Sequence, residues 1–235
     1  MSETNLYQNV RPLNKNRHGD WSVKPTTGYG FARNTNSCFL MTVEFPKAAR
    51  EFPIVFVKQE DDVFAAAVMG FRNDENLFVA ENGEWIGHYV PAYIRRYPFI
   101  PSSDVGGEMT VCIDENFSGF SHDGIGEPLF NEDGVPGEIL ESSMAFLRDF
   151  QGQSQLTLEF CKEIEKLDIL EPMGVRVDLN SGDSFALNNF MVVNRDRLAN
   201  LDPEKVQSLM KSGGLEVIYA HLASMDNFET LMGKI

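Results

Sequence analysis

The histidines and carboxylates of this 235-residue chain include four candidates for proton transfer. His18 lies in a polar segment, His221 lies in an apolar stretch with helical spacing, and Glu44 and Asp114 supply carboxylates. A histidine paired with a carboxylate can act as general acid and base near neutral pH. His18 or His221, with Glu44 or Asp114, is therefore a weak catalytic candidate. The alternative for His221 is a packed side chain that is hydrogen-bonded to the backbone.

A second set of residues is suited to recognition. Residues 76–101 hold the densest aromatic run of the chain, with two adjacent arginines near its end. Trp, Tyr and Arg contribute most to interface energies, and guanidinium groups hold carboxylates and phosphates. Two interpretations stay open: the arginines pin a loop of their own chain, or they hold a ligand or partner. Because consecutive helical residues point about 100° apart, we expect one arginine to be structural. The candidate binding residues are Trp85, Tyr89, Tyr93, Arg95, Arg96 and Tyr97.

The sequence predicts no metal site and no bound cofactor. Residues 104–138 hold nine carboxylates and no Lys or Arg, but they lack the alternate-residue spacing of a calcium-binding EF-hand. Asn131–Gly134 is better explained as a turn. No two histidines have the four-residue spacing of a zinc-binding helix. The segment Gly28-Tyr29-Gly30 is not a dinucleotide motif, because Arg33 stands where the third glycine belongs.

Ser121, His122 and Asp123 have the residue types of a catalytic triad, but we do not expect them to form one. Neighbouring residues in a loop rarely form a hydrogen-bonded triad, and neither a nucleophile elbow nor an oxyanion site is visible around them. We therefore expect no nucleophilic catalysis from this segment.

The charge distribution argues against a nucleic-acid partner. The formal net charge is −15. The first 58 residues carry eight Lys and Arg against four Asp and Glu, and the later residues carry twelve against thirty-one. Nucleic-acid binding needs clustered basic residues in excess, which this acidic body lacks. The basic N-terminal part is expected to lie across the acidic remainder.

Cysteine usage and hydropathy predict a cytoplasmic protein that does not insert into a membrane. Cys38, Cys112 and Cys161 are far apart and odd in number, which matches neither a disulfide framework nor a zinc site. The first twenty residues contain no apolar signal segment, and no run approaches the roughly 18 apolar residues of a membrane span. Surface association without a cleavable signal stays open.

Hydrophobic periodicity predicts an α+β fold with a mixed, mostly antiparallel sheet and the helices of the second half packed against it. Residues 1–37 are expected to form an extended N-terminal arm, and residues 38–235 a single domain. The predicted strands are residues 39–45, 54–57, 64–71, 76–80, 84–89 and 109–113, with 175–179 and 184–193 joining the same sheet around a turn at 180–183. The predicted helices are residues 46–51, a turn through 93–94, 139–151, a separate helix from Ser154 or Thr157 to 170–172, 203–212, one from 215 through 222, and a short one over 228–232.

Short motifs along nearly the whole chain resemble the SapC family. Where that family often has Gly-x-x-x-Val-Asp-Glu, this chain has Asn189 and Val193-Asn194-Arg195. The motifs that carry the resemblance are His18-Gly19-Asp20, Glu44–Lys58, Met69–Phe71, Asn76–Phe78, Trp85, Tyr89–Pro91, Arg95–Phe99, Cys112–Asp114, Glu127–Gly134, Phe160-Cys161, Leu170–Met173 and Tyr219–Met225.

The resemblance implies a bacterial protein linked to surface-layer loci, with some family members encoded beside flavin-dependent tryptophan halogenases and outer-membrane receptors. It implies no established reaction, cofactor or catalytic residue. The aromatic and proline motifs can therefore be core residues as well as site residues.

Three hypotheses for function follow. The first is a cytoplasmic binding or accessory protein that serves a bacterial surface-protein, uptake or modification system and has no catalysis of its own; its partner would be a protein or a small anionic or peptide ligand. The second is an enzyme that acts on a peptide or amino-acid-like substrate by histidine–carboxylate chemistry. The third is a structural component of the surface layer. A histidine–carboxylate pair in a pocket that also receives Arg95 or Arg96 would favour the enzyme, and singly buried histidines would disfavour it.

Overall fold

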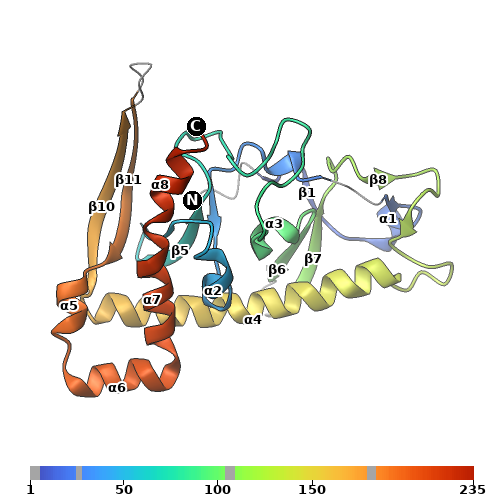
Figure 1. The fold of residues 1–235 in the computed structure, drawn as a ribbon. Helices are drawn as coiled ribbons and strands as arrows, with labels where there is room; N and C mark the ends of the chain where they lie inside the picture. The colour runs from blue at the N-terminus through green and yellow to red at the C-terminus, as the bar shows by residue number, and fades with distance from the viewer. Residues whose placement is uncertain (1–5, 25–27, 104–108, 179–183) are drawn as a thin grey trace. The chain divides into compact units, whose positions relative to one another are not determined.

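The computed structural model describes residues 6–24, 28–103, 109–178 and 184–235 (Figure 1). The chain divides into two compact units. The five-stranded unit is built from residues 29–93 and 153–235, and the pocket unit from residues up to 28 and 94–152. This division differs from the predicted arm and single domain, because strands within residues 10–23 pair with later strands of the pocket unit.

The five-stranded unit contains one antiparallel sheet in the order β10-β11-β4-β5-β3. The α+β class predicted from the sequence is confirmed, and so is the joining of the two late strands to this sheet. The predicted turn at 180–183 lies outside the described residues. The strands are β3 (Ser37–Phe39), β4 (Ile54–Gln59), β5 (Asp62–Val68), β10 (Leu170–Asp178) and β11 (Ser184–Val193).

The middle strand β4 and its neighbour β5 are apolar on both faces. β4 buries Ile54, Val55 and Phe56 in succession, which is typical of a strand covered on both sides rather than on one. The helix α7 contacts β4 and β11, and Ile218 and Leu222 of α7 are buried. The helices of this unit are η2 (Gly30–Ala32), η3 (Thr42–Glu44), α2 (Phe45–Ala48), α5 (Arg195–Ala199), α6 (Pro203–Ser212), α7 (Gly214–Ser224) and α8 (Asn227–Met232), together with the C-terminal half of α4 (Glu138–Lys166).

The strand predicted over residues 39–45 is wrong beyond Phe39. The chain turns there into η3 and then α2. Pro46 favours the first turn of a helix, and the Glu44 carboxylate accepts the backbone N–H of Met41 at 3.0 Å, which satisfies an otherwise open helical donor. Helix capping by Glu44 therefore determines the local structure of this segment, although its apolar residues are typical of a strand.

The prediction of two helices between residues 139 and 170 is also wrong. α4 is one continuous helix of 29 residues, and Gly152 lies within it. A single interior glycine costs only about 1 kcal/mol relative to alanine, and the glutamines on either side of it are good helix formers. Within the described part of the chain, no helix combines the length and apolarity that crossing a bilayer requires.

Substituting Gly152→Ala is expected to raise the free energy of unfolding by about 0.5–1 kcal/mol. Alanine loses less backbone entropy than glycine on folding, and a Cβ at this position meets no atom within 4 Å. Urea denaturation would measure the gain. The exposed Ala145→Gly on the same helix is the reciprocal control and should lose a similar amount; an unchanged or lower stability for Gly152→Ala would contradict a regular helix at this point.

The pocket unit contains two three-stranded antiparallel sheets, β1-β7-β6 and β8-β2-β9. The predicted strand at 109–113 is present as β7, but it belongs to the first of these and not to the five-stranded sheet. The core of the unit consists of Val23, Phe99, Val111, Ile113, Phe117, Leu129, Leu140 and Leu147. Its elements are β1 (Val10–Pro12), α1 (Lys15–His18), β2 (Ser22–Val23), β6 (Phe99–Ser103), β7 (Met109–Asp114), β8 (Phe120–Ser121), β9 (Glu127–Pro128) and the N-terminal half of α4, with α3 (Ala92–Arg95) at the unit boundary.

The two strands predicted over residues 76–80 and 84–89 are reduced to one bridge, between Val79 and Trp85. The turn between them contains Gly83 at φ 87°. The arms pair only near the turn, where Ala80 donates to Glu84 and Ile86 donates to Phe78. Farther out the donors bind elsewhere: the N–H of Phe78 donates to the Asn76 side chain, and that of His88 donates to the Glu51 carboxylate. The three cysteines, Cys38, Cys112 and Cys161, are buried.

Candidate functional site

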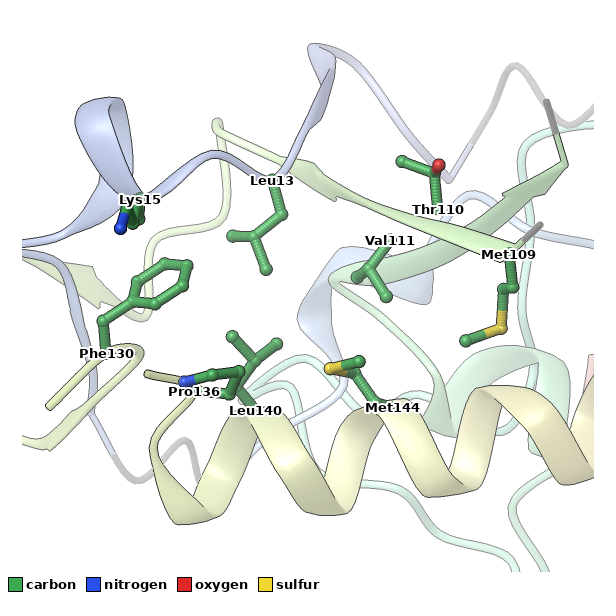
Figure 2. Close-up of a pocket in the computed structure, with 9 residues that line it drawn as sticks. All are labelled: Leu13, Lys15, Met109, Thr110, Val111, Phe130, Pro136, Leu140 and Met144. Atoms are coloured by element: carbon green, nitrogen blue, oxygen red, sulfur yellow. The ribbon is translucent and has the colours of Figure 1, made fainter. Parts of the chain in front are cut away.

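The pocket unit has a solvent-open cavity of about 300 Å³ on its surface (Figure 2). Its walls come from the segment between β1 and α1, from β7, from both sides of the turn before α4, and from the first two turns of α4. Small-molecule sites in proteins commonly have volumes of about 300–1,000 Å³ and mainly apolar walls. The lining residues are Leu13, Lys15, Met109, Thr110, Val111, Phe130, Pro136, Leu140 and Met144.

Backbone pairing fixes two sides of this cavity. The N–H of Leu13 donates to the Val111 carbonyl at 2.8 Å, which holds the N-terminal segment along β7. On the other side, the N–H of Gly134 donates to the Asn131 carbonyl at 2.9 Å, and Phe130 bridges to Pro136. The turn predicted at Asn131–Gly134 is therefore confirmed. It places Phe130 and Pro136 in one wall.

Lys15 is the one charged residue among the nine that line the cavity. Its stem runs beside the turn, with Cδ 3.7 Å from the position that a Cβ on Gly134 would occupy. Within residues 6–24, 28–103, 109–178 and 184–235, no carboxylate forms an ion pair with this ammonium group. Lys15 is exposed, so the cavity combines apolar walls with one solvent-accessible positive charge at its edge.

His18 has a carboxylate partner, but not an expected one. Its Nε2 lies 3.0 Å from Glu115 Oε1, and its Nδ1 accepts the N–H of Asn14 at 3.0 Å. Because Nδ1 accepts, Nε2 carries the proton and donates to Glu115. The ring is fully buried, stands edge-on to Trp21 and does not line the cavity.

Glu115 is fully engaged by its neighbours. Arg17 donates to both carboxylate oxygens, at 2.5 and 2.7 Å. The hydrogen bonds from Arg17 and then His18 lower the pKa of Glu115 to about 2, so the carboxylate stays ionised at neutral pH. This arrangement ties α1 to the end of β7. Glu115 is therefore not a group that exchanges protons near pH 7.

Asp114, the expected partner of a catalytic histidine, is completely buried and serves the backbone. Its oxygens accept the N–H groups of Gln8, Asn9 and Asn116 at 2.9–3.1 Å. The Tyr97 hydroxyl donates a fourth bond at 3.3 Å. A carboxylate with four donors holds a fold together and has no capacity left for a substrate.

Glu44 is used in the same way within the five-stranded unit. Its carboxylate accepts the N–H of Met41 and of Ala92, and the Tyr89 hydroxyl donates to it at 2.7 Å. The side chain is buried. It links η3 to the start of α3.

His221 is the packed histidine of the alternative interpretation. Its Nδ1 lies 2.7 Å from the carbonyl of Ile54, and its Nε2 accepts the N–H of Val193 at 3.0 Å. Burial lowers the pKa of His221 to about 4, against a smaller upward effect of the Ile54 bond, so the ring is neutral at pH 7. It joins α7 to β4 and β11.

The six predicted recognition residues are divided between the two units. Among these six, only Arg95 has an exposed side chain. Trp85 is half-buried; its ring lies 5.8 Å from Phe78, and its Nε1–H donates to the Tyr89 carbonyl at 3.0 Å. Tyr93 is buried. These aromatic groups serve the core of the five-stranded unit.

The two adjacent arginines have different surroundings. Arg96 is buried, donates from Nε to the Tyr7 hydroxyl at 3.0 Å, and packs over the rings of Tyr7 and Phe150. Arg95 is exposed and lies over Phe146. Arg96 is thus the structural arginine. Desolvation, reinforced by Asp114, raises the pKa of Tyr97, so this phenol stays protonated.

The segment Ser121–Asp123 has no triad geometry. Ser121 hydrogen-bonds directly to Asp123, whereas His122 is exposed and stands edge-on to Trp21 at 4.6 Å. Among the residues that the structure describes, no group of three or more His, Cys, Asp and Glu side chains is arranged to hold a metal ion. Residues 104–108 of the acidic segment lie outside that description.

Sequence reasoning missed Lys15 and Glu115 as site residues. The apolar spacing of Ile139, Leu140 and Met144 marks one face of a helix, and Met109–Val111 marks a strand, so the wall elements were predictable. Nothing in the local sequence around Lys15 distinguishes it from the other lysines. Its place beside the cavity depends on the pairing of β1 with β7, which joins residues about a hundred positions apart.

Comparison with known proteins gives one match. A family model described as SapC matches residues 13–231 of this chain. No curated protein and no solved structure matches it.

Proposed function

The chain belongs to the SapC family, and we propose that it is a binding protein without catalysis of its own. One observation supports this role: a cavity of about 300 Å³ with mainly apolar walls in the pocket unit. We propose that it serves a bacterial surface-protein, uptake or modification system. This proposal follows from the motif resemblance to the family. A cytoplasmic location belongs to the same proposal; recovery of the protein in a surface-layer extract after cell fractionation would contradict it.

The surroundings of the four catalytic candidates speak against the enzyme alternative. His221 binds only backbone groups, and Glu44 and Asp114 are saturated by donors within the fold. His18 does have a carboxylate neighbour, but neither histidine lines the cavity. Acid–base catalysis needs a group within hydrogen-bond reach of a substrate proton.

Filling the cavity with a larger side chain should weaken the binding of an apolar ligand. In Met144→Trp, a larger side chain replaces a half-buried residue of the wall. The probe is the neutral apolar fluorophore N-phenyl-1-naphthylamine, whose naphthalene ring fits the pocket while its phenyl group lies at the open side. We expect its affinity to fall at least tenfold, measured by fluorescence titration.

The matched control is Ala145→Trp, which adds the same side chain at an exposed position of the same helix, outside the cavity lining. It should bind the fluorophore as the wild type does. Circular dichroism would verify that both variants are folded. Equal affinities for the wild type and a folded Met144→Trp would contradict the proposal.

A further inference from the structure

The charged residue Lys15 lies at one side of the cavity, and the opposite side is mainly apolar, with Thr110 near Met109. Figure 2 shows Lys15 and Phe130 at one side of the space and Met109 at the other, with Leu13, Leu140 and Met144 pointing into it between them. A ligand that fills this space would have its head beside the ammonium group and its tail along the methionines. Such a ligand is amphipathic.

The volume sets the size of the tail. A protein cavity of about 150 Å³ lined by apolar side chains holds benzene, which has six carbon atoms. A volume of about 300 Å³ is therefore enough for roughly a dozen non-hydrogen atoms. An unbranched chain of about ten carbons with a small head group has this size.

The charge of the head follows from Lys15. This ammonium group has no ion-pair partner in the described part of the chain, although Glu132 and Asp133 stand in the adjacent turn. Both carboxylates are exposed, and the lysine stem passes 3.7 Å from the position that a Cβ on Gly134 would occupy. An anionic head group in the cavity could reach this exposed ammonium group and would form a charge-assisted hydrogen bond with it.

We infer that the ligand of the cavity is a free aliphatic carboxylate of about ten carbon atoms, with its carboxylate bound by Lys15. The inference rests on the proposed binding function and specifies the ligand class of the same site. A neutral apolar compound and the C-terminus of an apolar peptide are the two alternatives that its test separates.

The test compares decanoate with decanol by competition against N-phenyl-1-naphthylamine. We expect decanoate to bind the wild type about three- to tenfold more tightly than decanol, with the preference decreasing at high salt, because the contact is partly solvated. Lys15→Met keeps the apolar stem and should remove the preference, and Lys15→Arg should restore it. Lys47→Met, at an exposed lysine of the five-stranded unit, is the control and should change nothing.

The outcomes distinguish the inference from the proposed function. Equal binding of decanoate and decanol, unaffected by Lys15→Met but lost in Met144→Trp, would overturn the carboxylate assignment and leave the binding function intact. Tighter binding of N-acetyl-Leu-Leu than of decanoate would also overturn it, in favour of a peptide C-terminus. Failure of Met144→Trp to weaken any of the probes would overturn both proposals.

Discussion

Replacing Asp114 by Asn is expected to lower the free energy of unfolding of the pocket unit by about 3 kcal/mol. Hydrogen bonds to a charged group are worth about 1.5–3 kcal/mol each, and an unsatisfied buried donor costs a further 1–3 kcal/mol. Asp114 accepts from three backbone N–H groups and from Tyr97. An amide in its place turns an NH₂ group toward some of these donors, so at least one of them loses its acceptor.

The effect should extend to the cavity. Gln8 and Asn9 are held by Asp114, and the chain continues from them through β1 to Leu13 and Lys15. Asp114→Asn should therefore increase amide hydrogen exchange in β1 and weaken the binding of N-phenyl-1-naphthylamine. Urea denaturation would measure the stability. Asp149→Asn, at an exposed carboxylate on α4, is the control and should change it by less than about 0.5 kcal/mol. Equal stabilities for Asp114→Asn and this control would show that the carboxylate is not a structural anchor.

Acidification is expected to reduce the stability of the wild type through His221. The pKa of His221 is about 4 in the folded protein, against about 6.5 for an unperturbed histidine. Above pH 6.5 the ring is neutral in both states, so its buried contacts contribute fully. Between pH 6.5 and 4 the unfolded state binds the proton first, and stability falls by about 1.4 kcal/mol per pH unit, or about 3 kcal/mol in all.

A His221→Asn variant isolates this effect from the many carboxylates that titrate in the same range. At pH 7.5 it should be less stable than the wild type by about 2–3 kcal/mol, because asparagine cannot reach both Ile54 and Val193. The difference in unfolding free energy between the wild type and His221→Asn should be about 2 kcal/mol smaller at pH 5 than at pH 7.5. The control is His88→Asn, at a side chain that is 97% exposed. The stability difference between this variant and the wild type should be the same at pH 5 and at pH 7.5. Parallel pH profiles for the wild type and His221→Asn would contradict a buried neutral histidine.

Local sequence signals predicted the fold class well because helices and strands depend on short-range periodicity. The start of α6 at Asp202-Pro203 and its end at Gly213, with φ 80°, agree with the capping signals. The errors arose where local signals competed. Ser154 and Thr157 were interpreted as caps of a second helix although α4 continues through them, and capping at Glu44 prevented a strand in the apolar run after Phe39.

The candidate site was harder to predict because residue type does not reveal surroundings. Arg96 and Arg95 are identical side chains in neighbouring positions, but one is buried against Tyr7 and Phe150 and the other is exposed. His18 was a sound choice for a carboxylate contact, but its partner Glu115 is 97 residues away, next to the predicted Asp114. Only the pairing of β1 with β7 brings these groups together.

The most direct test of the binding role is a methyl NMR titration of protein labelled at the methionine ε-carbons, with N-phenyl-1-naphthylamine as the probe. Met109 and Met144 line the cavity, whereas Met210 is exposed and Met69 is buried in the five-stranded unit. We predict that the aromatic probe shifts the signals of Met109 and Met144 and leaves those of Met69 and Met210 in place. Shifts confined to Met210 or Met69, or no shift at Met109 and Met144, would contradict a binding site in this cavity.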